Sequence, residues 1–476
     1  MRLLASTESL CPFCFRRIPA RITGDDDDNV YLMKSCPTHG TFKVKVWSGV
    51  KSWMLWDAIQ DWEPERLEGE AFKAAIKGGC PFDCGLCPAH LRKACFVVME
   101  VTNRCDLTCP VCFADANRKK YAYEPDLDTI RDMYETILKF ERGLSVPSVQ
   151  ISGGEPTVRE DLPEIISIGK KLGLNHILLD TNGLRIAGDP SFLQLLKESG
   201  LDTLYLQFDG VSEDVYLKLR GRELMRHKVE AVKNCMKSDV GVVLVPTVVR
   251  GVNFHQIGGV IEFAMKWMPT VRGIMFQPMS HFGRYPHQPS NGARITVPDM
   301  LKAVEEQMNG KIRTQNFVPI RYGSGCESHC GFACMIGVKG KEVTPFTYYP
   351  THLEKFVDEK GKWRGPKHER GFLKRYWSPC TCLCKPTGGM ESDCCTQSQN
   401  AVSCECKPIN DADSDCLSIG GMHFQDAWNI DMRRVKKCCI HVVTPGGYLV
   451  PFCLFNVTTV AGDTFYRDKM LKANKK

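Results

Sequence analysis

Three cysteines in the first third of the chain have the spacing of an iron–sulfur ligand set. Cys105, Cys109 and Cys112 form a C-x3-C-x2-C motif that directly follows a strand-like run, Phe96–Val101. Three thiolates can hold three irons of a 4Fe-4S cluster and leave the fourth iron open to an external ligand. A zinc site is the alternative, but zinc sites usually pair two C-x2-C motifs. The spacing therefore predicts a cluster at which a reaction takes place, with these three cysteines as its catalytic ligands.

A second motif, Ser-Gly-Gly-Glu-Pro, follows about forty residues later, after the strand-like run Val149–Ile151. Its glycines let the backbone approach a ligand closely, and its glutamate can accept an ammonium group. Such a turn alone is weak evidence, because strand-to-helix connections often contain Gly and Pro. Together, however, the two motifs are typical of radical S-adenosylmethionine (SAM) enzymes, in which reductive cleavage of SAM yields a 5'-deoxyadenosyl radical. The SAM-binding residues predicted here are Gly153, Gly154, Glu155 and Pro156.

Composition fits an intracellular enzyme that binds metal. The chain has 476 residues, 43% of them hydrophobic and 25% charged, and its formal charge of +7 is spread without a long Lys/Arg run. We therefore expect no nucleic-acid partner. The N-terminus has no signal-like apolar region and no segment reaches the roughly 18 apolar residues of a membrane span, so we expect a cytoplasmic protein. The 25 cysteines favour metal ligation, because disulfide scaffolds belong to short secreted chains.

The elements that must position these motifs alternate along the chain. Six strands are predicted, at Phe96–Val101, Val149–Ser152, His176–Thr181, Leu204–Asp209, Val242–Val249 and Gly273–Gln277. Helices are predicted between them near 128–142, 161–172, 191–199, 212–237 and 255–268. This order predicts parallel βα units, either in a partial six-stranded (β/α)6 barrel or in a doubly wound sheet. The barrel is favoured, because both motifs then lie at its carboxyl-end mouth.

Other polar residues follow the later strands and would face the same mouth. They lie in Thr181–Gly183, in Gln207–Gly210, at Thr247 and in Gln277–Met279. Asn-Gly and Asp-Gly pairs also form ordinary turns. From this group we predict only Gln207 and Asp209 as further SAM-binding residues.

Two metal signatures precede the barrel. Cys11, Cys14, Cys36 and His39 resemble the paired knuckles of a rubredoxin with the last cysteine replaced by histidine, and Gly40 would permit the tight turn. We predict one Fe or Zn there, because both metals accept three sulfurs and one nitrogen. A surface role for the histidine is the alternative.

The second signature is another C-x3-C-x2-C motif, Cys80, Cys84 and Cys87, followed by Cys95. A fourth thiolate would close the cluster and make it auxiliary, whereas an open cluster would be a second SAM site. We favour closure by Cys95.

At this point the chain resembles the archaeal tetraether lipid synthase family, for which an older name is dihydro-hydroxymethylpterin methyltransferase. The resemblance lies in Gly-Cys-Pro-Phe-Asp-Cys-Gly-Leu-Cys-Pro, in Glu-Val-Thr-Asn-Arg-Cys, and in Cys-Cys-Ile-His followed by Pro-Phe-Cys. It covers residues 11 to about 340 and about 420 to 456. It implies three 4Fe-4S clusters, a rubredoxin-like mononuclear iron, and the joining of saturated carbons at isoprenoid chain ends.

The resemblance also implies ligands for the auxiliary clusters. Cys80, Cys84, Cys87 and Cys95 would hold one. Cys330, Cys439 and Cys453 are candidates for the other, with the fourth ligand open among Cys326, Cys334 and Cys438.

The chain departs from the family between Tyr376 and Leu417. Eight cysteines occur there: Cys380, Cys382, Cys384, Cys394, Cys395, Cys404, Cys406 and Cys416. A polar segment of this kind is either folded by metal or disordered. The departure puts the lipid substrate in doubt, because the C-terminal domain helps enclose what the radical attacks.

Four tryptophans, Trp47, Trp53, Trp56 and Trp62, lie within sixteen residues. They suit either an interfacial helix, with peripheral membrane contact, or a stripe packed on the barrel. The predicted domains are a rubredoxin-like domain (1–50), a Trp-rich linker with an auxiliary cluster loop (51–94), the barrel (95–320) and a C-terminal Cys-rich iron–sulfur domain (321–476).

Three functions remain open. The first is a radical enzyme that forms C–C bonds between lipid chain ends. The second is a radical enzyme that methylates or modifies a pterin or a peptide. The third, a cluster-bearing electron carrier, is disfavoured because a carrier needs no open iron. The two enzymes need a small-molecule or lipid substrate and an electron donor such as ferredoxin or flavodoxin.

Overall fold

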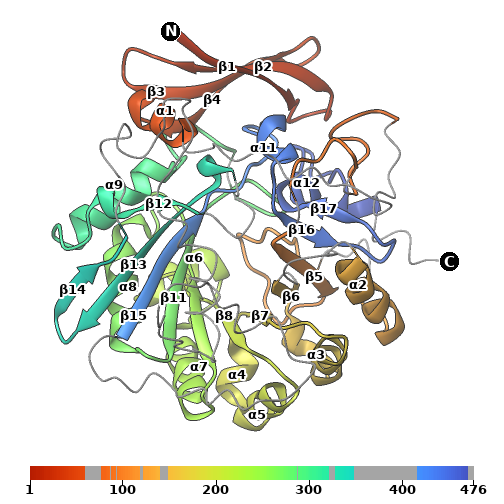
Figure 1. Cartoon of the computed structure of the whole chain (residues 1–476), viewed down its shortest axis with the longest axis vertical. Helices are drawn as coiled ribbons and strands as arrows, with labels where there is room; N and C mark the ends of the chain where they lie inside the picture. Colours follow the sequence, from red (N-terminus) through yellow and green to blue (C-terminus); the bar gives the residue numbers. More distant parts are fainter. Residues whose placement is uncertain are drawn as a thin grey trace, which may run out of the picture.

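The structure is a computed structural model (Figure 1). It describes residues 1–58, 77–85, 87–92, 94–117, 122–139, 148–286, 288–320, 327–347 and 415–469. Trp62, Cys326 and the cysteines from Cys380 to Cys406 lie outside these ranges, so their predicted roles stay untested.

The N-terminal residues form a four-stranded antiparallel meander that lies over the rest of the molecule, at the top of Figure 1. Its strands are β1 (Arg2–Leu10), β2 (Arg17–Gly24), β3 (Asn29–Cys36) and β4 (Gly40–Ser48). In β2 and β3 every second residue is buried, as expected for a sheet with one covered face. Gly40 has φ +78°, so the turn into β4 does need the glycine that the sequence places there.

Six parallel strands form the central part of the large sheet, and each pairs with the next in chain order. They are β5 (Phe96–Thr102), β6 (Ser148–Gly153), β7 (Ile177–Thr181), β8 (Thr203–Gln207), β9 (Gly241–Val245) and β11 (Val271–Pro278). The short strand β10 (Thr247–Val248) also pairs with β11. These strands are buried almost throughout, because a parallel sheet is covered on both faces. The predicted α/β class with a partial barrel is confirmed.

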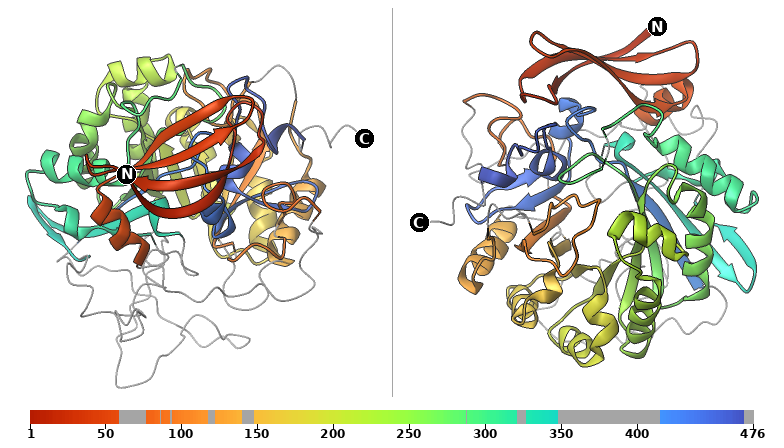
Figure 2. Two further views of the ribbon diagram at one scale, coloured as in Figure 1. Left: turned by 90° about the horizontal axis from the view of Figure 1, so that it is seen from above. Right: turned by 180° about the vertical axis from the view of Figure 1, so that it is seen from behind.

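The helices alternate with these strands and cover the outer face of the sheet (Figures 1 and 2). They are α2 (Leu127–Lys139), α3 (Leu162–Lys171), α4 (Leu184–Gly188), α5 (Pro190–Glu198), α6 (Glu213–Arg220), α7 (Met225–Lys237), α8 (Ile257–Lys266) and α9 (Val297–Gln307). The predicted helix 212–237 is two helices, because Gly221 ends α6 in the left-handed conformation. Short 3-10 turns are η1 (Pro156–Val158), η2 (Phe254–Gln256), η3 (Thr314–Asn316) and η4 (Ser328–Cys330).

The C-terminal residues extend both edges of the six-stranded sheet. β15 (Asp415–Met422) pairs in parallel with β11 at one edge, and β16 (Ile440–Val443) pairs in parallel with β5 at the other. The remaining elements are β12 (Val318–Pro319), β13 (Gly331–Lys339), β14 (Glu342–Pro345), α11 (Met432–Lys436), β17 (Leu449–Pro451) and α12 (Phe452–Asn456). The predicted boundary at residue 320 is therefore no break in the sheet, because β12 to β15 continue it.

The helix α1 (Val50–Ala58) carries two of the four tryptophans and faces the interior. Trp53 and Trp56 are 6% and 5% exposed, and Trp47 on β4 is 2% exposed. The rings of Trp53 and His329 stack with their centroids 4.8 Å apart. Of the two interpretations of this stripe, packing describes these three tryptophans. Among the described helices, none is long and apolar enough to cross a membrane.

Candidate functional site

The three cysteines of the first motif lie in the loop after β5 and line one end of a large cavity at the barrel mouth. The side chain of Asn117 braces this loop, because its amide donates to the carbonyls of Cys105 (2.9 Å) and Leu107 (3.1 Å). Arg284 braces it from the other side, through a hydrogen bond from Nε to the carbonyl of Cys109 (2.8 Å). These two side chains therefore help to position the cysteine loop.

The sulfurs of this loop suit a cationic iron centre. Backbone N–H groups of Leu107 and Ala116 lie 3.4 Å from the sulfurs of Cys105 and Cys112. Burial raises the pKa of the thiols of Cys105 and Cys109. Buried thiolates need positive charge beside them, and iron supplies it. The three side chains would hold a cluster at the cavity that all three line, and SAM would have access to it from that cavity.

The second motif ends β6 beside this loop. A Cβ on Gly153 would lie 2.2 Å from the carbonyl oxygen of Thr102, and one on Gly154 would lie 2.2 Å from that of Arg104. The backbone N–H groups of Gly154 and Glu155 donate to the same two carbonyls, at 2.7 and 2.8 Å. These glycines thus let β6 approach the protein's own cysteine loop, where we had expected a close approach to a ligand.

Glu155 lies in the cavity wall with an exposed fraction of 1%. Its Oε1 accepts hydrogen bonds from the backbone and hydroxyl of Thr157 and from the hydroxyl of Thr181. Its Oε2 accepts one, from the backbone of Asn182 at 2.7 Å. A carboxylate oxygen has room for a second donor. Glu155 is therefore fixed in position and can still accept the SAM ammonium, as predicted from the motif.

Gln207 and Asp209 differ in their access to the cavity. Gln207 lines it, whereas Asp209 is not in the lining and accepts hydrogen bonds from Arg220 through both oxygens, at 2.7 Å each. Burial opposes the charge of Arg220, but Asp209 and the nearby sulfur of Cys109 raise its pKa. We infer that Asp209 acts by positioning Arg220 beside the cysteine loop. Sequence reasoning missed Arg220, because an Arg-Gly pair at a helix end gives no signal of its own.

The cavity spans about 1630 Å³ including its open part, and polar and apolar side chains both line it. The cysteine loop contributes apolar residues beside its three ligands, and the barrel strands contribute polar ones such as Gln150, Gln207 and Gln277. Apolar lining residues from the barrel interior and the C-terminal segment include Phe96, Val98, Val245, Met275, Phe282, Met422, Phe424, Ile440 and Phe452.

A second acidic residue lines the cavity besides Glu155. Asp180 on β7 lines the cavity, and burial raises its pKa to about 7, against hydrogen bonds from Gln150 and Ser152 that lower it. A charged residue inside the run Ile-Leu-Leu-Asp-Thr was a signal that the sequence offered and that we did not use.

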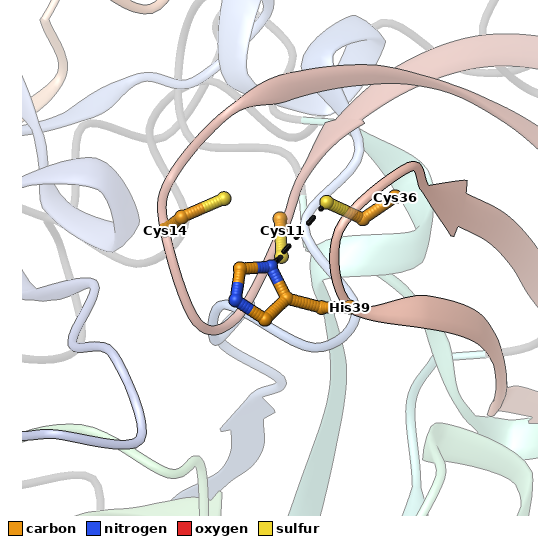
Figure 3. Close-up of side chains that lie close together, drawn as sticks. All are labelled: Cys11, Cys14, Cys36 and His39. Atoms are coloured by element: carbon orange, nitrogen blue, oxygen red, sulfur yellow. Dashed lines mark hydrogen bonds between the residues drawn. The ribbon is translucent and has the colours of Figure 1, made fainter.

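The N-terminal knuckles bring their four predicted ligands together, and Figure 3 shows the side chains converging. The ligand atoms of Cys11, Cys14, Cys36 and His39 all lie within 4.8 Å of one another. His39 Nδ1 is 3.5 Å from the sulfurs of both Cys11 and Cys36. Burial acts to raise the pKa of Cys36, but hydrogen bonds from His39 and from backbone groups lower it to about 6. Three sulfurs and one nitrogen in this arrangement fit a single tetrahedral Fe or Zn ion.

The other predicted ligands fall into two groups near the C-terminal segment. Cys80, Cys84 and Cys87 line a small cavity of their own. Burial raises the pKa of Cys453, and the nearby charges of Cys438 and Cys330 raise it further. Of the candidates for a fourth ligand, Cys334 lies apart in the core on β13, whereas Cys438 lies beside Cys330. All of these ligand assignments stay predictions.

Comparison with known proteins agrees with this geometry. The model of the radical SAM superfamily matches residues 99–264, and that of the HMPTM N-terminal zinc ribbon domain matches residues 3–48. The fold and the site thus define a radical SAM enzyme with an N-terminal zinc ribbon.

A protein of Methanocaldococcus jannaschii named 7,8-dihydro-6-hydroxymethylpterin dimethyltransferase is 36% identical over 487 aligned positions, which cover 94% of this chain and 93% of the relative. The chain belongs to the same family of radical SAM enzymes as that protein. The PqqA peptide cyclase of Methylorubrum populi is 27% identical, over 63% of this chain and 76% of its own. Among solved structures, Streptococcus suis SuiB has a TM-score of 0.38 at 18% identity, covering 46% of each chain.

Proposed function

We propose that this enzyme forms C–C bonds between the ends of isoprenoid lipid chains, by abstracting hydrogen from carbons that no neighbouring group activates. The observation that carries the proposal is the set of apolar side chains that line the same cavity as the cysteine loop. A hydrocarbon chain end offers no hydrogen-bonding group. Apolar side chains can hold it near a reacting centre.

Different residues of the chain would bind the cluster, bind SAM and exclude water. When bound, the 4Fe-4S cluster and SAM supply a 5'-deoxyadenosyl radical. Cys105, Cys109 and Cys112 would hold the cluster. Glu155 Oε2 would accept the ammonium group, and Phe424 and Phe452 would close the cavity from the C-terminal side. Exclusion of water by these aromatic side chains protects a radical from side reactions.

We also propose that the C-terminal cluster, for which Cys330, Cys439 and Cys453 are the predicted ligands, takes part in the chemistry. Gln425, whose N–H lies 3.3 Å from the sulfur of Cys453, follows directly after Phe424 of the cavity wall. Cys453 itself follows Phe452 of that wall. This site is therefore adjacent in the chain to residues that contact substrate in the proposal.

The test is lipid analysis of an archaeal host with and without the gene, combined with anaerobic assay of the purified enzyme. Lipids deuterated at the chain ends should pass deuterium into 5'-deoxyadenosine and yield a coupled product by mass spectrometry. Deuterium-free 5'-deoxyadenosine and unchanged host lipids would contradict the proposal.

Asp180 favours a second candidate, the methylation of a pterin. A buried carboxyl group beside Gln150 and Ser152 suits the hydrogen-bonding edge of a heterocycle, and the M. jannaschii relative carries a pterin in its name. Incubation with 7,8-dihydro-6-hydroxymethylpterin should then yield a methylated pterin, whereas a lipid-coupling enzyme should return the compound unchanged.

A further inference from the structure

The small cavity that Cys80, Cys84 and Cys87 line has His90 on its wall, and Cys95 is not in that wall. The other lining residues are Ala89, Val435, Lys436 and Pro451. The three cysteines leave one ligand position to be filled. The side chain that shares the cavity with them is an imidazole.

Cys95 instead faces the C-terminal segment. Its backbone N–H donates to the carbonyl of Cys439 (2.9 Å), and its sulfur lies 3.3 Å from the same oxygen. Cys439 directly follows Cys438, so Cys95 lies against the segment that carries these C-terminal cysteines.

The hydrogen bonds of His90 leave one ring nitrogen available as a ligand. Its Nε2 is 2.8 Å from the carbonyl oxygen of Cys438 and 3.2 Å from Nε2 of His441. A carbonyl only accepts, so the proton of the neutral ring is on Nε2 and the lone pair is on Nδ1. Within the described part of the chain, Nδ1 has no hydrogen-bond partner. Histidines that bind metal typically donate their other N–H to a backbone carbonyl in this way.

The imidazole is buried beside a second histidine. His90 is 7% exposed and His441 is fully buried against it, with ring centroids 4.9 Å apart. A neutral imidazole is the form that binds a metal ion.

We propose that Cys80, Cys84, Cys87 and His90 are the four ligands of the first auxiliary cluster, and that Cys95 belongs with Cys330, Cys438 and Cys453. The proposal rests on the presence of auxiliary clusters but not on the identity of the substrate. It is an alternative to closure by Cys95, the next cysteine after Cys87, and it follows from the absence of Cys95 among the residues that line the small cavity.

The assignment has an electronic consequence. An imidazole replaces one negatively charged thiolate, and replacement of Cys by His at iron–sulfur centres raises the reduction potential. The Cys438 carbonyl, which accepts from the imidazole, belongs to a residue of the second group, so a hydrogen bond joins the two sites.

The experiment uses the full chain with reconstituted clusters, in a background of Cys105→Ala, Cys109→Ala and Cys112→Ala that removes the SAM-binding cluster. Protein labelled with 15N-histidine is reduced with dithionite and measured by electron–nuclear double resonance. We expect a strongly coupled nitrogen whose frequency follows the isotope. H90C should lose this coupling, keep the iron content and have a lower reduction potential. C95S should keep the coupling.

The matched control is H255C, which makes the same substitution at an exposed position on η2 and should change nothing. Absence of a coupled nitrogen in the parent, its persistence in H90C, or its loss in C95S would each overturn the assignment. H90A serves as a second variant, and it should lose the coupling whether or not its cluster assembles fully. Because no readout involves substrate, the outcome is separate from the failure or success of the proposed function.

Discussion

The N-terminal knuckles and the loop after β5 both present cysteine side chains as metal ligands, but they use them for different purposes. In the knuckles four ligand atoms converge within 4.8 Å and leave no position for a substrate. In the loop only three cysteines are present, and they line a large cavity together with Glu155. A closed set suits structure or electron transfer, whereas an open set suits a reaction. The number of ligands and the space beside them therefore indicate function better than the presence of cysteines does.

The largest expected effect is the loss of SAM cleavage when the loop after β5 is changed and the N-terminal knuckles are left intact. Replacing Cys105, Cys109 and Cys112 by Ala should abolish formation of 5'-deoxyadenosine under dithionite, because no other described cysteine group opens into the main cavity. Metal analysis should show that the N-terminal metal remains. Undiminished nucleoside formation would refute the role of the loop.

A second variant tests the contact between the loop and β6. In Gly154→Ala the new Cβ would lie 2.2 Å from the carbonyl oxygen of Arg104, so the loop must move. We expect a loss of roughly 1–3 kcal/mol in stability, with a parallel loss of SAM cleavage per folded molecule. Gly188→Ala is the matched control, because nothing lies within 4 Å of its Cβ. Equal behaviour of the two variants in denaturation and in nucleoside assays would argue against the steric explanation.

The knuckles should respond in the opposite way. His39→Ala should reduce the metal content and the thermal stability of the N-terminal region, since the ion loses one of four ligands. His39→Cys should restore both, because thiolate also binds Fe and Zn in this geometry. SAM cleavage with dithionite should be nearly unchanged in either variant. Full metal retention in His39→Ala would show that the histidine is not a ligand.

The last prediction concerns pH and leaves the cysteine ligands unchanged. The pKa of Asp180 is raised from its ordinary value near 4 to about 7 in the folded protein. Its contribution to stability is therefore complete below about pH 4 and is lost as the pH rises through about 7. Asp180→Asn should gain stability relative to the parent over this range, by at most about 4 kcal/mol at 1.36 kcal/mol per pKa unit. Urea denaturation at about pH 5 and about pH 8 measures the free energy of unfolding of both proteins. If the difference in this free energy between the two proteins is the same at both pH values, the raised pKa is contradicted.

Much of the central barrel could be predicted from local patterns. Apolar runs such as Ile177–Thr181 are long enough to be strands and too short to be buried helices, and each carries its chemistry at the carboxyl end. The cysteine motifs could also be recognised from the sequence, because three or four ligands within a short segment constrain their own geometry. Conversely, Pro246 divides the predicted strand 242–249 into β9 and β10, since proline has no N–H for the sheet ladder.

The rest depended on contacts between distant parts of the chain. No local pattern shows that β15 and β16 join opposite edges of one sheet. Nor does any local pattern show that the carboxylate of Asp209 forms an ion pair with Arg220. The orientations of the Cys95 and His90 side chains could not be predicted either, because both side chains contact residues of the C-terminal segment. Ligand identity in a shared site is thus a property of the tertiary structure.

The pairing of β5 with β16 also bears on how the chain folds during its synthesis. Phe96 pairs with Ile440, so this edge of the sheet stays open until the chain has been synthesised past Ile440. Contacts between such distant residues form slowly, and unpaired strand edges promote aggregation while they are exposed. The cysteine loop is likewise synthesised long before Phe424 and Phe452, which line the same cavity. The ribosome therefore produces the cluster ligands well before the residues that complete the cavity around them.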